Sequence, residues 1–158
     1  EDRDSLEGVG RLVDKLARKG FRDIHVSVNP FIPKAQTPFQ WLPLASRSYL
    51  TEASKLIRRS MPKGLNVRLD ILKPAQAELQ ALLSLGDRRA GRVVEYMALS
   101  GGGRGALRRA VKIAGLRLED VVYSAKTLEE HLPWGMIRSS NLELLRKLYR
   151  KLESESVR

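Results

Sequence analysis

Cysteine is absent from the 158 residues of this sequence, and this absence excludes several kinds of chemistry. Without thiols the chain can form no disulfide, no thiolate metal site and no cysteine-held iron–sulfur cluster. Histidine is scarce as well, since only His25 and His131 occur, far apart and without the HExxH spacing of a zinc enzyme. The sequence therefore predicts no metal site and no complete catalytic site within this chain.

Long apolar runs are also missing. No segment approaches the roughly 20 apolar residues that a helix needs to span a bilayer. The first residues, Glu1 to Asp4, have neither the basic start nor the apolar stretch of a signal peptide. Hydrophobic residues make up 42% and charged residues 30%, which is ordinary for a globular protein. We therefore expect a cytoplasmic protein without a membrane partner.

Positive charge exceeds negative charge in this sequence. The formal net charge is +11, and the excess falls mainly in residues 45–73 and 104–158. Two interpretations remain open at this point. The basic stretches either form a face that binds a polyanion, or they are the solvated surface of an arginine-rich protein.

Hydrophobic periodicity predicts an α/β arrangement followed by helices. Helices are expected at 4–19 and 46–60 and strands at 24–29 and 65–72, joined by a proline-rich loop over 30–44. Further helices are expected at about 75–84, 87–99, 104–114 and 140–153, with a short one at 118–124 or 127–131. A helix, a short glycine turn and a strand are half of a βαβ unit, so the pattern begins inside a repeating α/β series.

One face of the predicted strand at 24–29 is polar and consists of His25, Ser27 and Asn29. Apolar residues alternate with them on the other face. In a barrel of strands and helices, a polar inward face is typical of an interior that holds a ligand, and active sites lie at the carboxyl ends of the strands. The alternative interpretation is a half-exposed edge strand in a small α/β fold.

The loop that follows is stiff and rich in aromatic residues. Its prolines are Pro30, Pro33, Pro38 and Pro43, and its aromatic residues are Phe31, Phe39 and Trp41. The prolines restrict the backbone, so the polar side chains between them are presented at low entropic cost. These polar residues are Lys34, Gln36, Thr37 and Gln40. Such a loop at the end of a strand suits the wall of a binding site.

Residues 26–41 read VSVNPFIPKAQTPFQW. This segment resembles the late-barrel motif, VSxSxFxPKPxTPFQW, of radical S-adenosylmethionine (SAM) enzymes, specifically the cobalamin-binding family of Fe-S oxidoreductases. Ala35 stands where the family has its second proline. Two further landmarks follow in order, because residues 86–89 resemble the family's GDRR and residues 132–134 resemble its LPW. Gly135 replaces the Asp that usually follows in relatives.

The resemblance implies that this chain is the C-terminal part of a larger radical SAM enzyme. Residues 1–73 would form the last βα units of a partial barrel, with about two strands, and residues 74–158 a mainly helical C-terminal region. The family's CxxxCxxC motif lies upstream, so this chain alone would bind no cofactor and would be inactive. The whole protein would hold a 4Fe-4S cluster and S-adenosylmethionine, together with cobalamin in those members that use it.

The same resemblance implies which residues form the wall of the substrate and SAM cavity. They are His25, Ser27, Asn29, Lys34, Gln36, Thr37, Gln40 and Trp41. The first three would face the cavity, and Lys34, Thr37 and Trp41 would line its rim. The implied partner is the preceding part of the same protein. An unpaired barrel edge would also favour self-association.

Asp87, Arg88 and Arg89 allow two interpretations. The paired arginines could bind a phosphate or a carboxylate as a bidentate clamp. Alternatively, Asp87 caps the helix predicted at 87–99, and the two arginines are solvated or ion-paired in its first turn. Cations at a helix N-terminus oppose the helix dipole, which favours an acidic partner.

An alternative function is a basic RNA-binding module for tRNA or rRNA. The two basic stretches favour it, together with Tyr49, Tyr96, Tyr123 and Tyr149. Against it, no recognised RNA-binding motif occurs, and the tyrosines do not cluster near the basic runs as a stacking platform would.

Overall fold

The computed structural model describes residues 2–137 and 141–156, which form a mixed α/β, mainly helical protein of two compact units. The sheet unit consists of the chain up to Pro30 together with Ala45–Pro74. The helical unit consists of Phe31–Leu44 together with the chain from Ala75 onward. The sheet unit ends at Pro74, and residues 31–44 pack with the helices and not with the strands that flank them in sequence.

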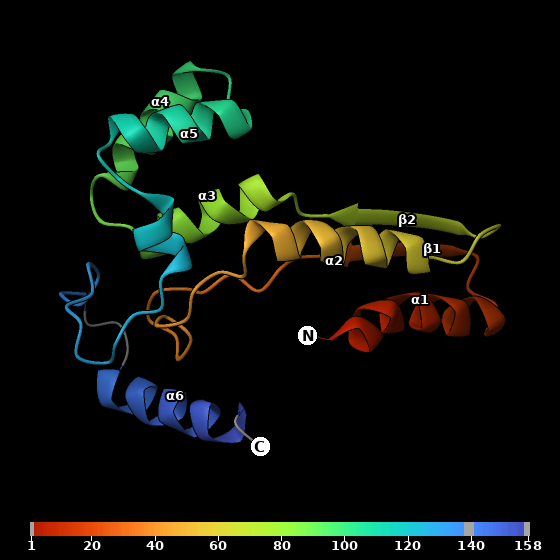
Figure 1. The fold of residues 1–158 in the computed structure, drawn as a ribbon. Helices are drawn as coiled ribbons and strands as arrows, with labels where there is room; N and C mark the ends of the chain where they lie inside the picture. The colour runs from red at the N-terminus through yellow and green to blue at the C-terminus, as the bar shows by residue number, and fades with distance from the viewer. Residues whose placement is uncertain (1, 138–140, 157–158) are drawn as a thin grey trace. The chain divides into compact units, whose positions relative to one another are not determined.

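The sheet unit contains two helices and two strands (Figure 1). They are α1 (Arg3–Arg18), β1 (Asp23–Val28), α2 (Arg47–Ser60) and β2 (Asn66–Ile71). The strands pair in parallel, with a register that runs from Asp23 opposite Asn66 to Val28 opposite Ile71. All four elements lie within one residue of the predicted bounds.

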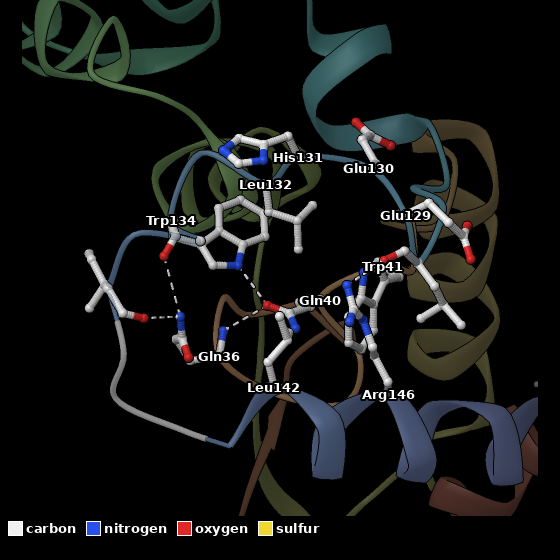
Figure 2. Close-up of a pocket in the computed structure, with 13 residues that line it drawn as sticks. Gln36, Gln40, Trp41, Glu129, Glu130, His131, Leu132, Trp134, Leu142 and Arg146 are labelled. Atoms are coloured by element: carbon white, nitrogen blue, oxygen red, sulfur yellow. Dashed lines mark hydrogen bonds between the residues drawn. The ribbon is translucent and has the colours of Figure 1, made fainter.

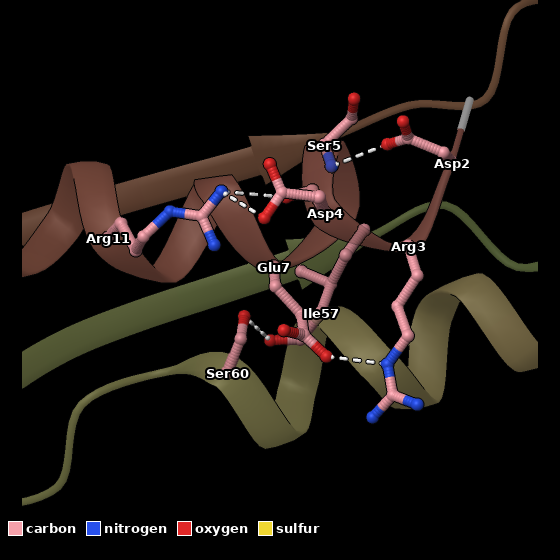
Figure 3. Close-up of polar contacts among 8 residues, drawn as sticks. All are labelled: Asp2, Arg3, Asp4, Ser5, Glu7, Arg11, Ile57 and Ser60. Atoms are coloured by element: carbon pink, nitrogen blue, oxygen red, sulfur yellow. Dashed lines mark hydrogen bonds and ion pairs between the residues drawn. The ribbon is translucent and has the colours of Figure 1, made fainter.

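Helices α1 and α2 pack directly against each other. The buried residues of this pair are Leu6, Gly10, Val13, Leu50 and Ile57. The closest approach is at Gly10, where an ideal Cβ would lie 2.1 Å from the carbonyl oxygen of Ser60. Figure 3 shows Arg3, Asp4, Glu7 and Arg11 of α1 together with Ile57 and Ser60 of α2, and Arg11 and Asp4 form an ion pair of 3.0 Å. Because a Cβ at position 10 would overlap the Ser60 backbone, only glycine permits the observed spacing of the two helices.

The strands have one half-buried face and one exposed face. Exposure alternates along both strands, and the half-buried residues are the apolar ones. Because successive side chains point to opposite faces of a strand, the apolar face lies against the helices and the polar face is open.

The helical unit contains four α-helices and one π-helical turn. They are α3 (Pro74–Leu85), α4 (Ala90–Leu99), α5 (Gly103–Ile113), η1 (Glu119–Tyr123) and α6 (Leu142–Ser156). The short helix is thus at the first of its two predicted places. Helix α4 begins three residues later than predicted. The last helix is predicted at 140–153, and residue 140 lies outside the described residues. Between α4 and α5, the run Gly101–Gly103 has positive φ throughout, a conformation that glycine adopts at little cost.

The core of the helical unit is built around two tryptophans. Its members are Trp41, Leu85, Leu132, Trp134, Leu145 and Tyr149. The rings of Trp41 and Tyr149 are 5.2 Å apart. The Trp41 carbonyl also accepts a hydrogen bond of 2.8 Å from the backbone of Lys126. These contacts explain why residues 31–44 belong to the helical unit.

In the described part of the chain, no helix has the length and apolar character that a membrane crossing requires.

Candidate functional site

The exposed face of the sheet unit carries a connected polar group. We call the group formed by His25, Ser27, Arg68 and Asp70 the strand face. In the strand register His25 lies opposite Arg68, and Ser27 lies opposite Asp70. His25 Nε2 is 2.7 Å from Asp70 Oδ2, and Arg68 Nε donates to the same oxygen at 3.2 Å. Asp70 therefore connects a histidine on β1 with an arginine on β2.

The charges of the strand face are set by these contacts. The hydrogen bond from His25 lowers the pKa of the Asp70 carboxyl, and the positive charge of Arg68 lowers it further. Asp70 is therefore ionised at neutral pH, and it holds the His25 imidazole with Nε2 as the donor. The His25 and Asp70 side chains are 55% and 53% exposed. Ion pairs between side chains this exposed contribute little to stability.

Asn29 follows β1 directly and is exposed. It thus lies at the carboxyl end of the strand, the end at which barrel enzymes place their catalytic residues. His25, Ser27 and Asn29 belong to the sheet unit, whereas the other five predicted wall residues belong to the helical unit.

The loop residues have different surroundings from those that the resemblance implies. Trp41 is 1% exposed and lies in the core of the helical unit, not at an open rim. Thr37 shapes the loop, because its hydroxyl donates to the Lys34 carbonyl at 2.8 Å and accepts from the Phe39 amide at 3.3 Å. Lys34 itself is exposed.

Gln36, Gln40 and Trp41 line a cavity of about 400 Å³ within the helical unit, which we call the Gln40 cavity (Figure 2). Gln40 is 1% exposed, and its Oε1 accepts hydrogen bonds from Trp134 Nε1 at 2.6 Å and from the backbone amide of Gln36 at 3.1 Å. Arg146, on α6, lines the same cavity. No sequence pattern points to Arg146, because only the packing of α6 brings it there.

The Asp87–Arg89 segment favours the structural interpretation. Asp87 Oδ1 accepts a hydrogen bond of 2.8 Å from the Arg89 amide. The Arg89 guanidinium bonds both carboxylate oxygens of Asp87, and its Nη1 donates to the Gly115 carbonyl at 2.8 Å. These bonds from Arg89 lower the pKa of the Asp87 carboxyl. These bonds shape the turn that precedes α4 and connect it to Gly115, just after α5, although no side chain caps the first turn of α4. Both arginines of the predicted anion clamp are exposed, but Arg89 is bonded to Asp87 and to the Gly115 carbonyl.

The three tyrosines of the helical unit do not form a stacking platform. Tyr149 is buried against Trp41, and the Tyr123 hydroxyl donates to Glu78. Hydrogen bonds from Arg109 and Ser100 lower the pKa of Tyr96, which places it beside α5. Base stacking of the kind that single-stranded RNA uses thus has little support.

Helix α5 nevertheless has a basic side. Arg104, Arg108 and Lys112 are all exposed and follow one another at intervals of four residues. Side chains at this spacing lie on one side of a helix. The helix contains no acidic residue.

Comparisons with protein-family models, curated proteins and solved structures give no match for this chain. Among residues 2–137 and 141–156, no group of three or more His, Asp or Glu side chains is placed to hold a metal ion. The strand face and the Gln40 cavity each bring together polar side chains from distant parts of the sequence.

Proposed function

We propose that this chain is the C-terminal part of a radical SAM enzyme, in which the strand face forms part of the wall of the cavity for substrate and S-adenosylmethionine. One observation supports this most: two parallel strands carry apolar residues on the helix side and an ion-paired polar group on the open side. Parallel sheets are normally covered on both faces, because crossover helices pack on them. A polar open face is instead suited to a barrel interior with a ligand.

The edges of the sheet support the same proposal. Within the described residues β1 pairs with β2 alone, so each strand has one edge without a neighbour. Further strands of a barrel would add to these edges. Helices α1 and α2 would then lie on the outside of the barrel, as the helices of such folds do.

The roles of the strand face follow from its contacts. Asp70 orients His25, whose imidazole offers a polar contact to a bound molecule. Arg68 offers a planar, charged donor that suits a carboxylate, such as that of S-adenosylmethionine. The iron–sulfur cluster supplies the reductive chemistry in such enzymes, and its cysteines belong to the preceding part of the protein, since this chain has none.

The first test separates the stability of the strand face from its function. Because the pair is exposed, His25→Ala and Asp70→Asn should each change the free energy of unfolding of this chain only slightly. In the whole protein, the same changes should reduce SAM cleavage by about tenfold or more, which corresponds to the loss of about 1.4 kcal/mol of transition-state binding. Urea titration and single-turnover assays measure the two effects.

A matched control is Asp4→Asn, which removes the exposed Arg11–Asp4 pair of α1 and should affect neither measurement. Unchanged turnover in both strand-face variants would remove these residues from the cavity wall. The coding sequence upstream of Glu1 gives a simpler check, because a reading frame without a CxxxCxxC motif there would end the radical SAM assignment.

A second candidate function is RNA binding by the helical unit, which the basic side of α5 favours. If Arg104, Arg108 and Lys112 contact phosphates, Arg108→Ala should weaken binding to tRNA and lower the slope of log K against log salt by about 1. The exposed residue Arg150 on α6 provides the control Arg150→Ala. An unchanged slope for Arg108→Ala, measured by filter binding over a salt series, would contradict this function.

A further inference from the structure

Three buried nitrogen atoms without a hydrogen-bond partner belong to residues that line the Gln40 cavity. They are Gln40 Nε2, Trp41 Nε1 and Arg146 Nε. They come from two distant segments, since Gln40 and Trp41 precede α2 whereas Arg146 is on α6. Buried donors in proteins almost always have an acceptor, so three exceptions around one cavity require an explanation.

The orientation of the Gln40 amide is fixed by its neighbours. Its Oε1 accepts from Trp134 Nε1 at 2.6 Å and from the Gln36 backbone amide at 3.1 Å. Both neighbours are donors only. An inverted amide would place its own N–H groups against them, so the amide nitrogen must be on the other side. Gln40 therefore keeps two N–H groups unpaired.

Arg146 is held in a similar way. Its Nη1 donates to Glu143 Oε1 at 2.8 Å, and its Nη2 donates to the Leu128 carbonyl at 3.1 Å. These two bonds fix the plane of the guanidinium and leave Nε unpaired. Trp41 is fixed by its packing on Tyr149, which leaves the indole N–H unpaired as well.

The unpaired groups have one chemical character. Gln40, Trp41 and Arg146 together offer four N–H hydrogens, and the buried unpaired side-chain atoms of the described residues include no acceptor. A matching ligand group accepts several hydrogen bonds and donates none. An ionised carboxylate has two oxygens with about four acceptor positions, and it also suits the positive charge of Arg146.

We propose that the Gln40 cavity binds a small organic carboxylate, whose oxygens accept from Gln40, Trp41 and Arg146. The rest of the ligand contacts the apolar part of the lining, which includes Leu128, Leu132, Ile137 and Leu142. The volume of about 400 Å³ lies in the range of small-molecule sites. Ile137 and Leu142, which line the cavity, are 59% and 41% exposed.

Two carboxylates in the lining do not compete for the donors. Glu130 Oε2 accepts from the Thr127 backbone amide at 3.3 Å. Figure 2 shows the Glu129 and Glu130 carboxylates directed away from Gln40 and Arg146. Neither lining carboxylate therefore pairs with the three nitrogen atoms.

The two tryptophans of the chain provide a direct probe, since both Trp41 and Trp134 line the cavity. We expect 4-methylpentanoate to produce a saturable change in the intrinsic fluorescence of the 158-residue chain. Its neutral analogue 4-methylpentanamide should bind at least about tenfold more weakly, because it lacks the second acceptor oxygen and the charge. Inorganic phosphate, which lacks the apolar part, should also bind more weakly.

The decisive variant is Gln40→Glu. It keeps an oxygen for Trp134 and Gln36 but replaces the two N–H donors by negative charge. Carboxylate binding should fall by at least about tenfold, with circular dichroism showing that the helices remain. Arg146→Lys removes the Nε donor and keeps the charge, so it should also weaken binding, whereas Arg150→Lys one turn later on α6 should leave it unchanged.

Several results would overturn the proposal. They are the absence of a saturable signal with the carboxylate, equal binding of acid and amide, tighter binding of phosphate than of the carboxylate, and unchanged affinity in folded Gln40→Glu. If Gln40→Glu fails to fold, folded Arg146→Lys decides, and unchanged affinity there has the same meaning. Because the strand face plays no part in these measurements, their outcome is independent of the proposed radical SAM function.

Discussion

Replacing Gly10 with alanine should destabilise the sheet unit by about 1–3 kcal/mol or more, the usual cost of overpacking a close contact. The added Cβ would lie 2.1 Å from the Ser60 carbonyl oxygen and 2.7 Å from its carbonyl carbon. These atoms belong to the backbone of α2, so no side-chain rotation can relieve the overlap. The two helices must move apart, which would weaken the packing of Leu6 and Val13 of α1 against α2.

The matched control is Gly8→Ala on the same helix. There the new methyl group meets only the end of the Arg11 side chain, with Nη2 at 3.3 Å, and that chain can rotate away. Alanine is a better helix former than glycine by about 1 kcal/mol, so this variant should be slightly more stable than the natural chain. Urea titration followed by circular dichroism compares the two. Equal stability of Gly10→Ala and Gly8→Ala would contradict the packing described for α1 and α2.

The second large effect is expected for Trp41→Ala, which should destabilise the helical unit by about 3–5 kcal/mol, as removal of a buried aromatic side chain does. Trp41 is 1% exposed and packs with Leu85, Leu145 and Tyr149. Its loss would leave a cavity among α3, α6 and the segment Phe31–Leu44. Trp134 would then be the sole tryptophan, and its fluorescence during urea titration reports this unit directly.

Phe31→Ala provides the comparison, because it removes an aromatic ring from the same segment. Phe31 is 54% exposed, and its ring contacts Phe39 edge-on at 5.1 Å. Its removal should cost no more than about 1 kcal/mol. If Phe31→Ala destabilised the helical unit as much as Trp41→Ala, the assignment of Trp41 to the core of this unit would be wrong.

The elements of the sheet unit could be predicted from the sequence because their signals are local. Strand alternation shows in residues 24–29 and 65–72, and Gly20 with positive φ closes the turn after α1. The start of α4 was less predictable, since Asp87 bonds the Arg89 amide and delays the helix to Ala90. Local periodicity does not show which residue of a polar turn will cap a helix.

The surroundings of the proline-rich segment could not be predicted, because they depend on residues far along the chain. The sequence indicates that Trp41 is rigidly held but not that Tyr149 is its neighbour. The Gln40 cavity requires atoms from the segment Phe31–Leu44, from residues 128–137 and from α6. No pattern within any one of these segments reveals the unpaired N–H groups that the three together produce.

Phe31–Leu44 is separated along the sequence from the rest of the helical unit, and this has a consequence for synthesis on the ribosome. Gln40 and Trp134 are bonded across 94 positions, and Trp41 also needs Leu145 and Tyr149 from α6. A nascent polypeptide emerges from its N-terminus, so the indole of Trp41 is left without its partners until α6 has been translated. During that interval the aromatic segment is a target for chaperones, although the sheet elements on both sides of it are already complete.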